Sequence, residues 1–184
     1  MSSPVMPAPE GLELIRKFVN TLDIEEGTDA LADDERAAEW LSGQGFVSPR
    51  ESSSGANARY LRELRAALRE ALAANHSGSP LTEETATALN EAITQSNLTP
   101  VIDTDATVAL RSYGGHLDRL VGALAEEMTS AMSEGTWKRL KICSNDRCRW
   151  AFYDRSPARS GKWCSMSICG NRTKQQSWRG RRGR

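Results

Sequence analysis

The sequences CSNDRC at residues 143–148 and CSMSIC at residues 164–169 hold all four cysteines of the chain. Four residues separate the cysteines within each stretch, and fifteen residues separate the two stretches. Two close pairs joined by a hairpin-sized insert suit a structural zinc site with four thiolate ligands at about 2.3 Å. We therefore predict that one Zn²⁺ is bound by Cys143, Cys148, Cys164 and Cys169.

Spacing alone leaves an iron–sulfur cluster, redox-active thiols and disulfides as alternatives, because four residues between paired cysteines are less usual than two. A catalytic zinc is disfavoured, since four thiolates leave no open coordination position for water. The chain has no apolar run of about 20 residues and no signal peptide at residues 1–10. We therefore expect a cytoplasmic, nucleoid-associated protein with no membrane partner. Disulfides are rare in that compartment, which favours metal ligands.

The segment that holds the cysteines is strongly basic. Residues 138–184 contain fourteen Lys or Arg and two acidic residues, a formal charge of +12, whereas residues 1–137 carry −12. A basic segment on an acidic body is typical of a nucleic-acid contact surface. The segment is too short to fold on apolar burial alone, and structural zinc supplies about 10–16 kcal/mol in small finger peptides. We expect its small core to consist of Leu140, Ile142, Trp150, Phe152 and Trp163.

The residues before the cysteines have the apolar periodicity of amphipathic helices. We predict helices over residues 10–22, 33–42, 58–74, 82–97 and 115–134, and a short hairpin within residues 98–112. Residue 33 or 34, Asn57 and Thr82 are the expected N-caps. Arg62, Arg65 and Arg69 lie opposite the apolar stripe of the third helix, which indicates a solvated helix face rather than a second nucleic-acid patch.

These elements predict a mainly α (α+β) chain. A helical N-terminal domain with a small β-hairpin would precede a treble-clef or ribbon-like four-cysteine zinc finger that ends in a helix. We expect a disordered N-terminus at residues 1–9, a regulatory or dimerisation domain at 10–136, the finger at 137–178 and a basic tail at 179–184. The sequence has no Gly-rich phosphate loop, no nucleophile elbow and only two histidines, so we predict that the protein is not an enzyme.

Residues 152–174, FYDRSPARSGKWCSMSICGNRTK, resemble the CGNR-type zinc finger. The resemblance extends over about residues 140–178. The chain departs from the family at Gly161-Lys162, where two arginines are usual, and lysine binds phosphate only as a point charge. The matching positions are Phe152, Asp154, Ser156, Trp163, Cys164, Ser165, Met166, Cys169, Gly170, Asn171, Arg172 and Lys174.

Residues 18–23, FVNTLD, resemble the opening Asn-Thr signature of the ABATE domain, which usually precedes this finger. The similarity is spread thinly over residues 10–135. Proteins with this pair of domains are regarded as stress-related transcription regulators. The resemblance therefore implies a regulator with a structural zinc.

The residues after the second cysteine pair can continue as a helix toward a nucleic-acid groove, where Arg pairs well with guanine and Gln or Asn with adenine. Asn171 and Arg172 have a second interpretation, in which Asn171 bonds the turn backbone and Arg172 pairs with Asp154. The expected base readers are Arg172, Gln175, Gln176 and Arg179, with Asn171 also available. The expected phosphate contacts are Arg149, Arg155, Arg159, Lys162, Lys174 and, in the tail, Arg181 and Arg182.

The sequence thus predicts a transcription regulator whose finger binds double-stranded DNA. A finger of this size contacts few base pairs, so we expect the protein to form a homodimer or to dock on the transcription machinery. We also expect the helical domain to bind a small ligand. An RNA-binding protein and a zinc-containing protein–protein adaptor remain alternatives. The Arg-Gly tail and the aromatic residues favour RNA binding. An acidic protein partner for the basic surface would favour the adaptor.

Overall fold

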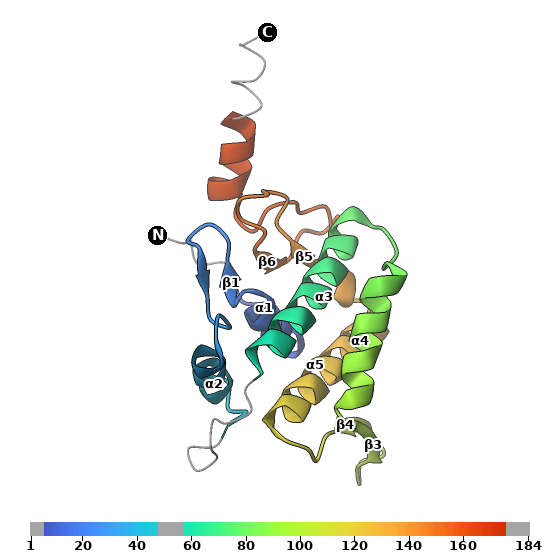
Figure 1. Cartoon of the computed structure of the whole chain (residues 1–184). Helices are drawn as coiled ribbons and strands as arrows, with labels where there is room; N and C mark the ends of the chain where they lie inside the picture. Colours follow the sequence, from blue (N-terminus) through green and yellow to red (C-terminus); the bar gives the residue numbers. More distant parts are fainter. Residues whose placement is uncertain (1–5, 48–56, 176–184) are drawn as a thin grey trace.

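The structure is a computed structural model that describes residues 6–47 and 57–175 (Figure 1). It confirms the predicted fold class, because helices dominate and the strands form three small antiparallel hairpins. The helices are α1 (Glu10–Val19), α2 (Asp34–Gly43), α3 (Ala58–Ser77), α4 (Glu83–Gln95) and α5 (His116–Ser133). The hairpins are β1 (Leu22–Asp23) with β2 (Thr28–Asp29), β3 (Thr99–Ile102) with β4 (Val108–Arg111), and β5 (Leu140–Ile142) with β6 (Ala151–Tyr153).

The predicted helix starts are confirmed by their caps. Asp33 accepts a hydrogen bond from the Arg36 amide, Asn57 from the Tyr60 amide and Thr82 from the Thr85 amide. Each side chain satisfies an amide that the first helical turn leaves without a partner. Capping is local, which explains why the sequence located these helices closely.

The first helix ends earlier than predicted, at Val19 instead of residue 22. Its apolar periodicity continues through Leu22, but Thr21 turns the chain and its hydroxyl donates to the Phe18 carbonyl. The β1–β2 hairpin follows, and Gly27 in its loop has a φ of +68°, where glycine is favoured. The sequence analysis did not predict this hairpin, because its strands are too short to show an alternating pattern.

One hydrophobic core joins the helices to the start of the cysteine-bearing segment. Helices α1, α3 and α5 pack together, and the β5–β6 hairpin packs against α3 and α1 (Figure 1). Leu140, Ile142 and Ala151 are buried in this core, whereas Phe152 and the half-buried Trp163 pack around the cysteines. The prediction that Leu140 and Ile142 belong to a separate core of the finger is therefore wrong, since they pack with the helical body.

The prediction of a solvated arginine face on α3 is also wrong, because Arg65 is 5% exposed and Arg69 is 7% exposed. Arg65 donates to both carboxylate oxygens of Asp29, at 2.5 and 2.8 Å, and Arg69 donates to the carbonyls of Val19 and Leu22. Burial alone would raise the pKa of Asp29, but the Arg65 guanidinium lowers it. These buried cations therefore stabilise the turn after α1 instead of facing solvent.

Glu10 begins α1, and residues 6–9 lead into it with Ala8 buried against the body. The predicted basic tail at 179–184 lies outside the described residues. None of the helices in residues 6–47 and 57–175 has both the length and the apolar character that a bilayer-spanning segment requires.

The half-buried Glu127 on α5 gives a pH-dependent test of this packing. Burial raises its pKa to about 7, from an ordinary value near 4.5, while its carboxylate accepts a 3.4 Å hydrogen bond from the Ile15 amide. Because the pKa of Glu127 is higher in the folded than in the unfolded chain, the neutral carboxyl stabilises the fold fully below pH 4.5. This contribution to the free energy of unfolding is lost as the pH rises through 7. Glu127→Gln should therefore stabilise the fold by an amount that grows from pH 5 to 7 and reaches about 1–2 kcal/mol.

Urea unfolding of both proteins between pH 5 and 8.5 measures this difference. Glu91→Gln, at an exposed position on α4, is the matched control and should show no such pH dependence. A Glu127→Gln protein whose stability follows that of the parent at every pH would contradict the burial of a carboxylate between α1 and α5.

Candidate metal centre and nucleic-acid surface

The four cysteine sulfurs gather at one point, with all Sγ atoms within 4.8 Å of one another. Cys148 Sγ lies 3.6 Å from Cys164 Sγ, which lies 3.8 Å from Cys169 Sγ. Four sulfurs at about 2.3 Å from a tetrahedral zinc lie about 3.8 Å apart. The thiol positions therefore fit one zinc ion with four protein ligands.

Two turns present these sulfurs. Between β5 and β6, the Asn145 carbonyl accepts hydrogen bonds from the Cys148 and Arg149 amides, and Arg149 has a φ of +47°. In the second pair, Cys164 lies just before the short π-helical turn η2 (Met166–Gly170) and Cys169 lies within it. The Ser165 carbonyl accepts a hydrogen bond from the Gly170 amide at this turn. A hydrogen bond from the Ser144 amide to the Lys162 carbonyl joins the two turns. These backbone turns thus bring the four sulfurs to one point.

Without a cation the four thiols cannot all ionise. Hydrogen bonds from Cys148 and Cys164 lower the pKa of Cys143 to about 2, whereas hydrogen bonding to Cys143 and Cys148, together with burial, raises the pKa of Cys164. One thiolate therefore suppresses ionisation of its neighbours. A divalent cation removes this repulsion and allows all four sulfurs to be thiolates.

A buried ion pair braces the loop between the cysteine pairs. Lys141 on β5 donates to Asp154 at 2.8 Å and to the Arg159 carbonyl at 2.5 Å, and both charged side chains are at most 5% exposed. Burial alone would raise the pKa of Asp154, but hydrogen bonds from Lys141, Ser156 and Gly161 hold it well below its ordinary range. A Cβ on Gly161 would lie 2.6 Å from an Asp154 oxygen, so glycine suits this position.

The metal-binding segment is also bonded to the helical body. The Asn20 side chain donates to the Ala151 carbonyl at 2.9 Å and accepts from the Ala151 amide at 2.7 Å, as a neighbouring strand would. Asn75 on α3 donates to the carbonyls of Trp137 and Leu140, and His76 Nε2 lies 2.7 Å from the Ser144 hydroxyl. The β5–β6 hairpin is therefore held by backbone hydrogen bonds as well as by apolar packing.

Two charged contacts extend this attachment. Arg149 faces Glu70 of α3 at 3.6 Å, and Arg172, after η2, pairs with Glu25 in the β1–β2 loop. The predicted alternative in which Arg172 pairs with Asp154 is wrong, because Lys141 occupies that carboxylate. The alternative for Asn171 is confirmed, since its side chain donates to the Ser167 carbonyl.

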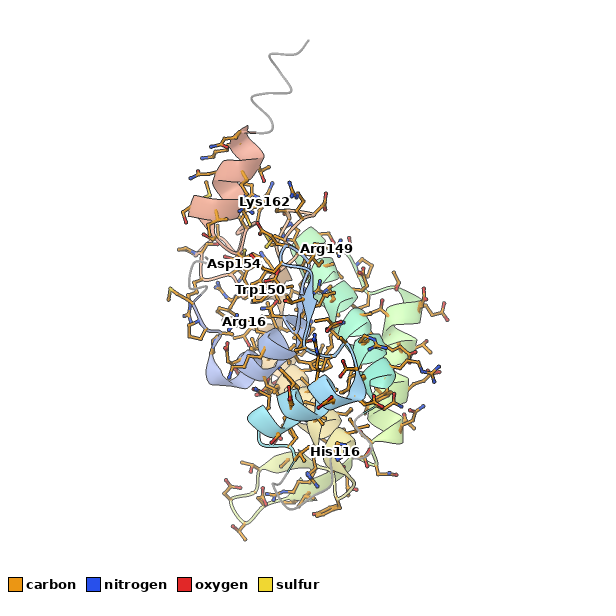
Figure 2. The ribbon with its side chains drawn as sticks, turned by 60° about the vertical axis from the view of Figure 1, so that its left-hand side comes forward. Arg16, His116, Arg149, Trp150, Asp154 and Lys162 are labelled. Atoms are coloured by element: carbon orange, nitrogen blue, oxygen red, sulfur yellow. The ribbon has the colours of Figure 1, made fainter. Side chains whose placement is uncertain are left out.

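Most of the predicted nucleic-acid contacts that the structure describes are exposed. Arg155 donates to the Pro7 carbonyl and lies over the Tyr153 ring, while Arg149 is only half-exposed. In Figure 2 the labelled Lys162 lies beside the helix that follows the second cysteine pair. The exposed residues are Arg155, Arg159, Lys162, Asn171, Arg172, Lys174 and Gln175. Gln176, Arg179, Arg181 and Arg182 lie outside the described residues.

The sequence analysis did not assign contacts to Asn20, Asn75 or His76. The sequence does contain a feature that points to Asn20, because this residue belongs to the Asn-Thr pair that carries the ABATE resemblance. No sequence feature points to Asn75 or His76, since a polar residue at the end of a helix is usually solvated. Their partners lie more than sixty residues away and become visible only in the folded chain.

Loss of the Asn20 side chain tests the attachment of the metal centre to the body. Asn20→Ala leaves the amide and carbonyl of the fully buried Ala151 without partners, so we expect unfolding to become easier by about 2–4 kcal/mol. Zinc should also transfer faster to a chelator, because the hairpin whose loop carries Cys143 and Cys148 loses support. Denaturant unfolding and a colorimetric zinc-release assay measure both effects. Asn90→Ala, on the exposed face of α4, is the control, and equal behaviour of the two variants would contradict the attachment.

Comparison with known families covers nearly the whole chain. The ABATE family, described as "Putative stress-induced transcription regulator", matches residues 12–135, and the CGNR zinc finger family matches residues 139–182. No curated protein matches the chain. Neither family is an enzyme family, and the second accounts for the thiolate cluster, which holds a single structural zinc. The chain therefore belongs to the ABATE family of regulators, and its C-terminal segment is a CGNR zinc finger.

Proposed function

We propose that the protein is a DNA-binding transcription regulator whose zinc finger contacts duplex DNA. The observation that carries this proposal is the opposite placement of charge in the two parts of the chain. The body buries Arg65 and Arg69, whereas the finger buries its acidic Asp154 against Lys141 and leaves its other cations largely exposed. The finger thus presents positive charge that its own carboxylates do not neutralise, as phosphate binding requires.

The shape of the finger supports access to a groove. Residues 171–175 continue from η2 as an α-helix that points away from the body (Figure 1), and Arg172 on it contacts Glu25 of the β1–β2 loop. Arg172 and Gln175 on this helix are the proposed base readers, together with Gln176 and Arg179 beyond the described residues. Arg155, Arg159, Lys162 and Lys174 are the proposed phosphate contacts. We assign Arg149 to the body contact with Glu70 instead.

Salt-dependent binding tests the proposal. We expect the zinc-loaded protein to bind duplex DNA with an affinity that falls steeply with salt, and Cys164→Ser to abolish this binding. Lys174→Gln should reduce the slope of log K against log salt by about one, because one phosphate contact is lost. Lys138→Gln removes an exposed cation outside the proposed surface and should leave the slope unchanged. Fluorescence anisotropy with genomic duplexes and with RNA of equal length provides the measurement.

The contact between Arg172 and Glu25 makes a sharper prediction for the same assay. Glu25 competes with DNA for Arg172, so Glu25→Gln should tighten binding by up to about fivefold at low salt, the range of an exposed ion pair. Glu26→Gln removes the same charge next to it without that contact and should change the affinity less. Equal effects of both variants, preference for RNA, or salt-insensitive binding would contradict the proposal.

We further propose that the regulator is a homodimer formed through the β3–β4 hairpin. Ile102 and Val108 are cross-strand partners that are 77% and 68% exposed, and Tyr113 nearby is 77% exposed. This apolar patch lies at the end of the molecule opposite the finger (Figure 1). A second copy would cover it and leave both fingers free, which would extend the DNA site beyond the few base pairs that one finger contacts.

Sedimentation equilibrium tests the dimer. The parent protein should sediment as a dimer at micromolar concentration, and Val108→Lys should sediment as a monomer because a charge cannot be buried unpaired in the interface. Thr87→Lys adds the same charge on the exposed face of α4 and should remain dimeric. A monomeric parent protein would exclude this interface.

A further inference from the structure

A cleft of about 760 Å³ lies where the helical body meets the finger. Its walls come from α1, the β1–β2 hairpin and α2 on the body side and from Trp150 on the finger side. Figure 2 shows the labelled Trp150 near Arg16, and both residues line this cleft. The proposed DNA surface does not include it.

Two tryptophans on different elements give the cleft its aromatic character. Trp40 on α2 and Trp150 are each half-buried, so part of each indole faces the cleft. The Trp40 ring is fixed by a tilted contact with Phe18, with 5.5 Å between the ring centroids. Indoles held in this way offer a surface on which a flat ring can pack without a large loss of side-chain freedom.

Most of the charged groups around the cleft already have partners. Asp29 is paired with Arg65, Asp23 accepts the amides of Glu25 and Glu26, and Arg16 is paired with Glu13. Of the other lining charges, Lys17 and Glu39 form no ion pair among the described residues, and Arg36 lies 3.7 Å from the exposed Asp33. Over the whole lining three cations face three carboxylates, so the net charge is zero. Lys17 and Arg36 are the two cations that no carboxylate holds closely, since the Arg36–Asp33 distance is 3.7 Å against 2.6 Å for Arg16–Glu13.

The polar groups on the floor are also occupied. The Asn20 amide is used by Ala151, and the Thr21 hydroxyl donates to Phe18 and accepts from Arg65. A ligand would therefore gain little from the floor. Its recognition would come from the two indole surfaces and from the cations at the rim.

We propose that this cleft binds a small planar aromatic anion. The ring packs against Trp40 and Trp150, and the anionic group is held by Lys17 and Arg36. Because Trp150 also supplies the carbonyl that accepts the Cys143 amide at 2.9 Å, a bound ring contacts the residue that supports a zinc ligand. Ligand binding therefore slows zinc release, whether or not the finger binds DNA.

Isothermal titration calorimetry of the zinc-loaded full chain with 2-naphthoate tests the site. We expect saturable 1:1 binding with a Kd below about 1 mM. Lys17→Gln, at an exposed position that folding does not need, should weaken binding about three- to tenfold, and Trp40→Leu should weaken it by tenfold or more. Lys138→Gln, which removes a distant exposed cation, should bind like the parent protein.

Two further titrants separate ring packing from charge. Cyclohexanecarboxylate has the charge without the flat ring, and 2-naphthalenemethanol has the ring without the charge, so each should bind at least fivefold more weakly. Equal binding of cyclohexanecarboxylate, an unchanged Kd in Lys17→Gln, or no saturable heat with 2-naphthoate would each overturn the proposal. Because no DNA is present, these outcomes do not depend on the DNA-binding function.

Discussion

The pairing of the Asn20 side chain with the Ala151 backbone is the constraint on which the placement of the finger depends. One amide group replaces a missing strand at the edge of β6, with hydrogen bonds of 2.9 and 2.7 Å. Leu140 and Ile142, on the adjacent strand, are buried in the core of the helical body. Zinc therefore organises the two cysteine turns, while the body positions the β5–β6 hairpin whose loop is the first of these turns. Regulator domain and finger consequently behave as one folded unit.

Buried arginines make this constraint possible. Asn20 lies in the turn between α1 and β1, and the carbonyls on either side of it, those of Val19 and Leu22, accept hydrogen bonds from Arg69. Arg65 binds Thr21 and Asp29 in the same region. Arg65 pairs with the Asp29 carboxylate, whereas Arg69 bonds only through one nitrogen, and its Nε and Nη1 have no hydrogen-bond partner among the described residues. The turn is therefore specified by these hydrogen bonds as well as by packing. The result is a body that buries Arg65 and Arg69, beside a finger that buries Lys141 and leaves most of its other cations exposed.

This arrangement also connects three features that are distant in the sequence. The β1–β2 hairpin lines the aromatic cleft with Asp23 and Asp29, and its loop holds Arg172 through Glu25. The finger contributes Trp150 to the same cleft. The cleft therefore shares its β1–β2 wall with the contact to Arg172 and its Trp150 wall with the first cysteine turn. A regulator that responds to a small molecule requires a connection of this kind.

The sequence predicted features that depend on local chemistry. The caps at Asp33, Asn57 and Thr82 act within one helical turn, and the grouping of the cysteines follows from their spacing and the turns between them. It did not predict features that depend on distant partners. Arg65 is buried against the Thr21 hydroxyl and Arg69 against the Val19 carbonyl, each more than forty residues away, and amphipathic spacing alone places such residues in solvent. The assignment of Leu140 and Ile142 failed for the same reason, because strand periodicity does not reveal which core a strand joins.

The central claim is that the CGNR finger completes its fold on the helical body. The most direct measurement is the amide hydrogen exchange of residues 137–184, as a zinc-loaded fragment and within the zinc-loaded full chain. We predict that in the fragment the amides around the cysteines are protected, whereas those of Ile142 and Ala151 exchange freely and become protected only in the full chain. Equal protection of Ile142 and Ala151 in the isolated fragment would show that the finger folds by itself, and would contradict the claim.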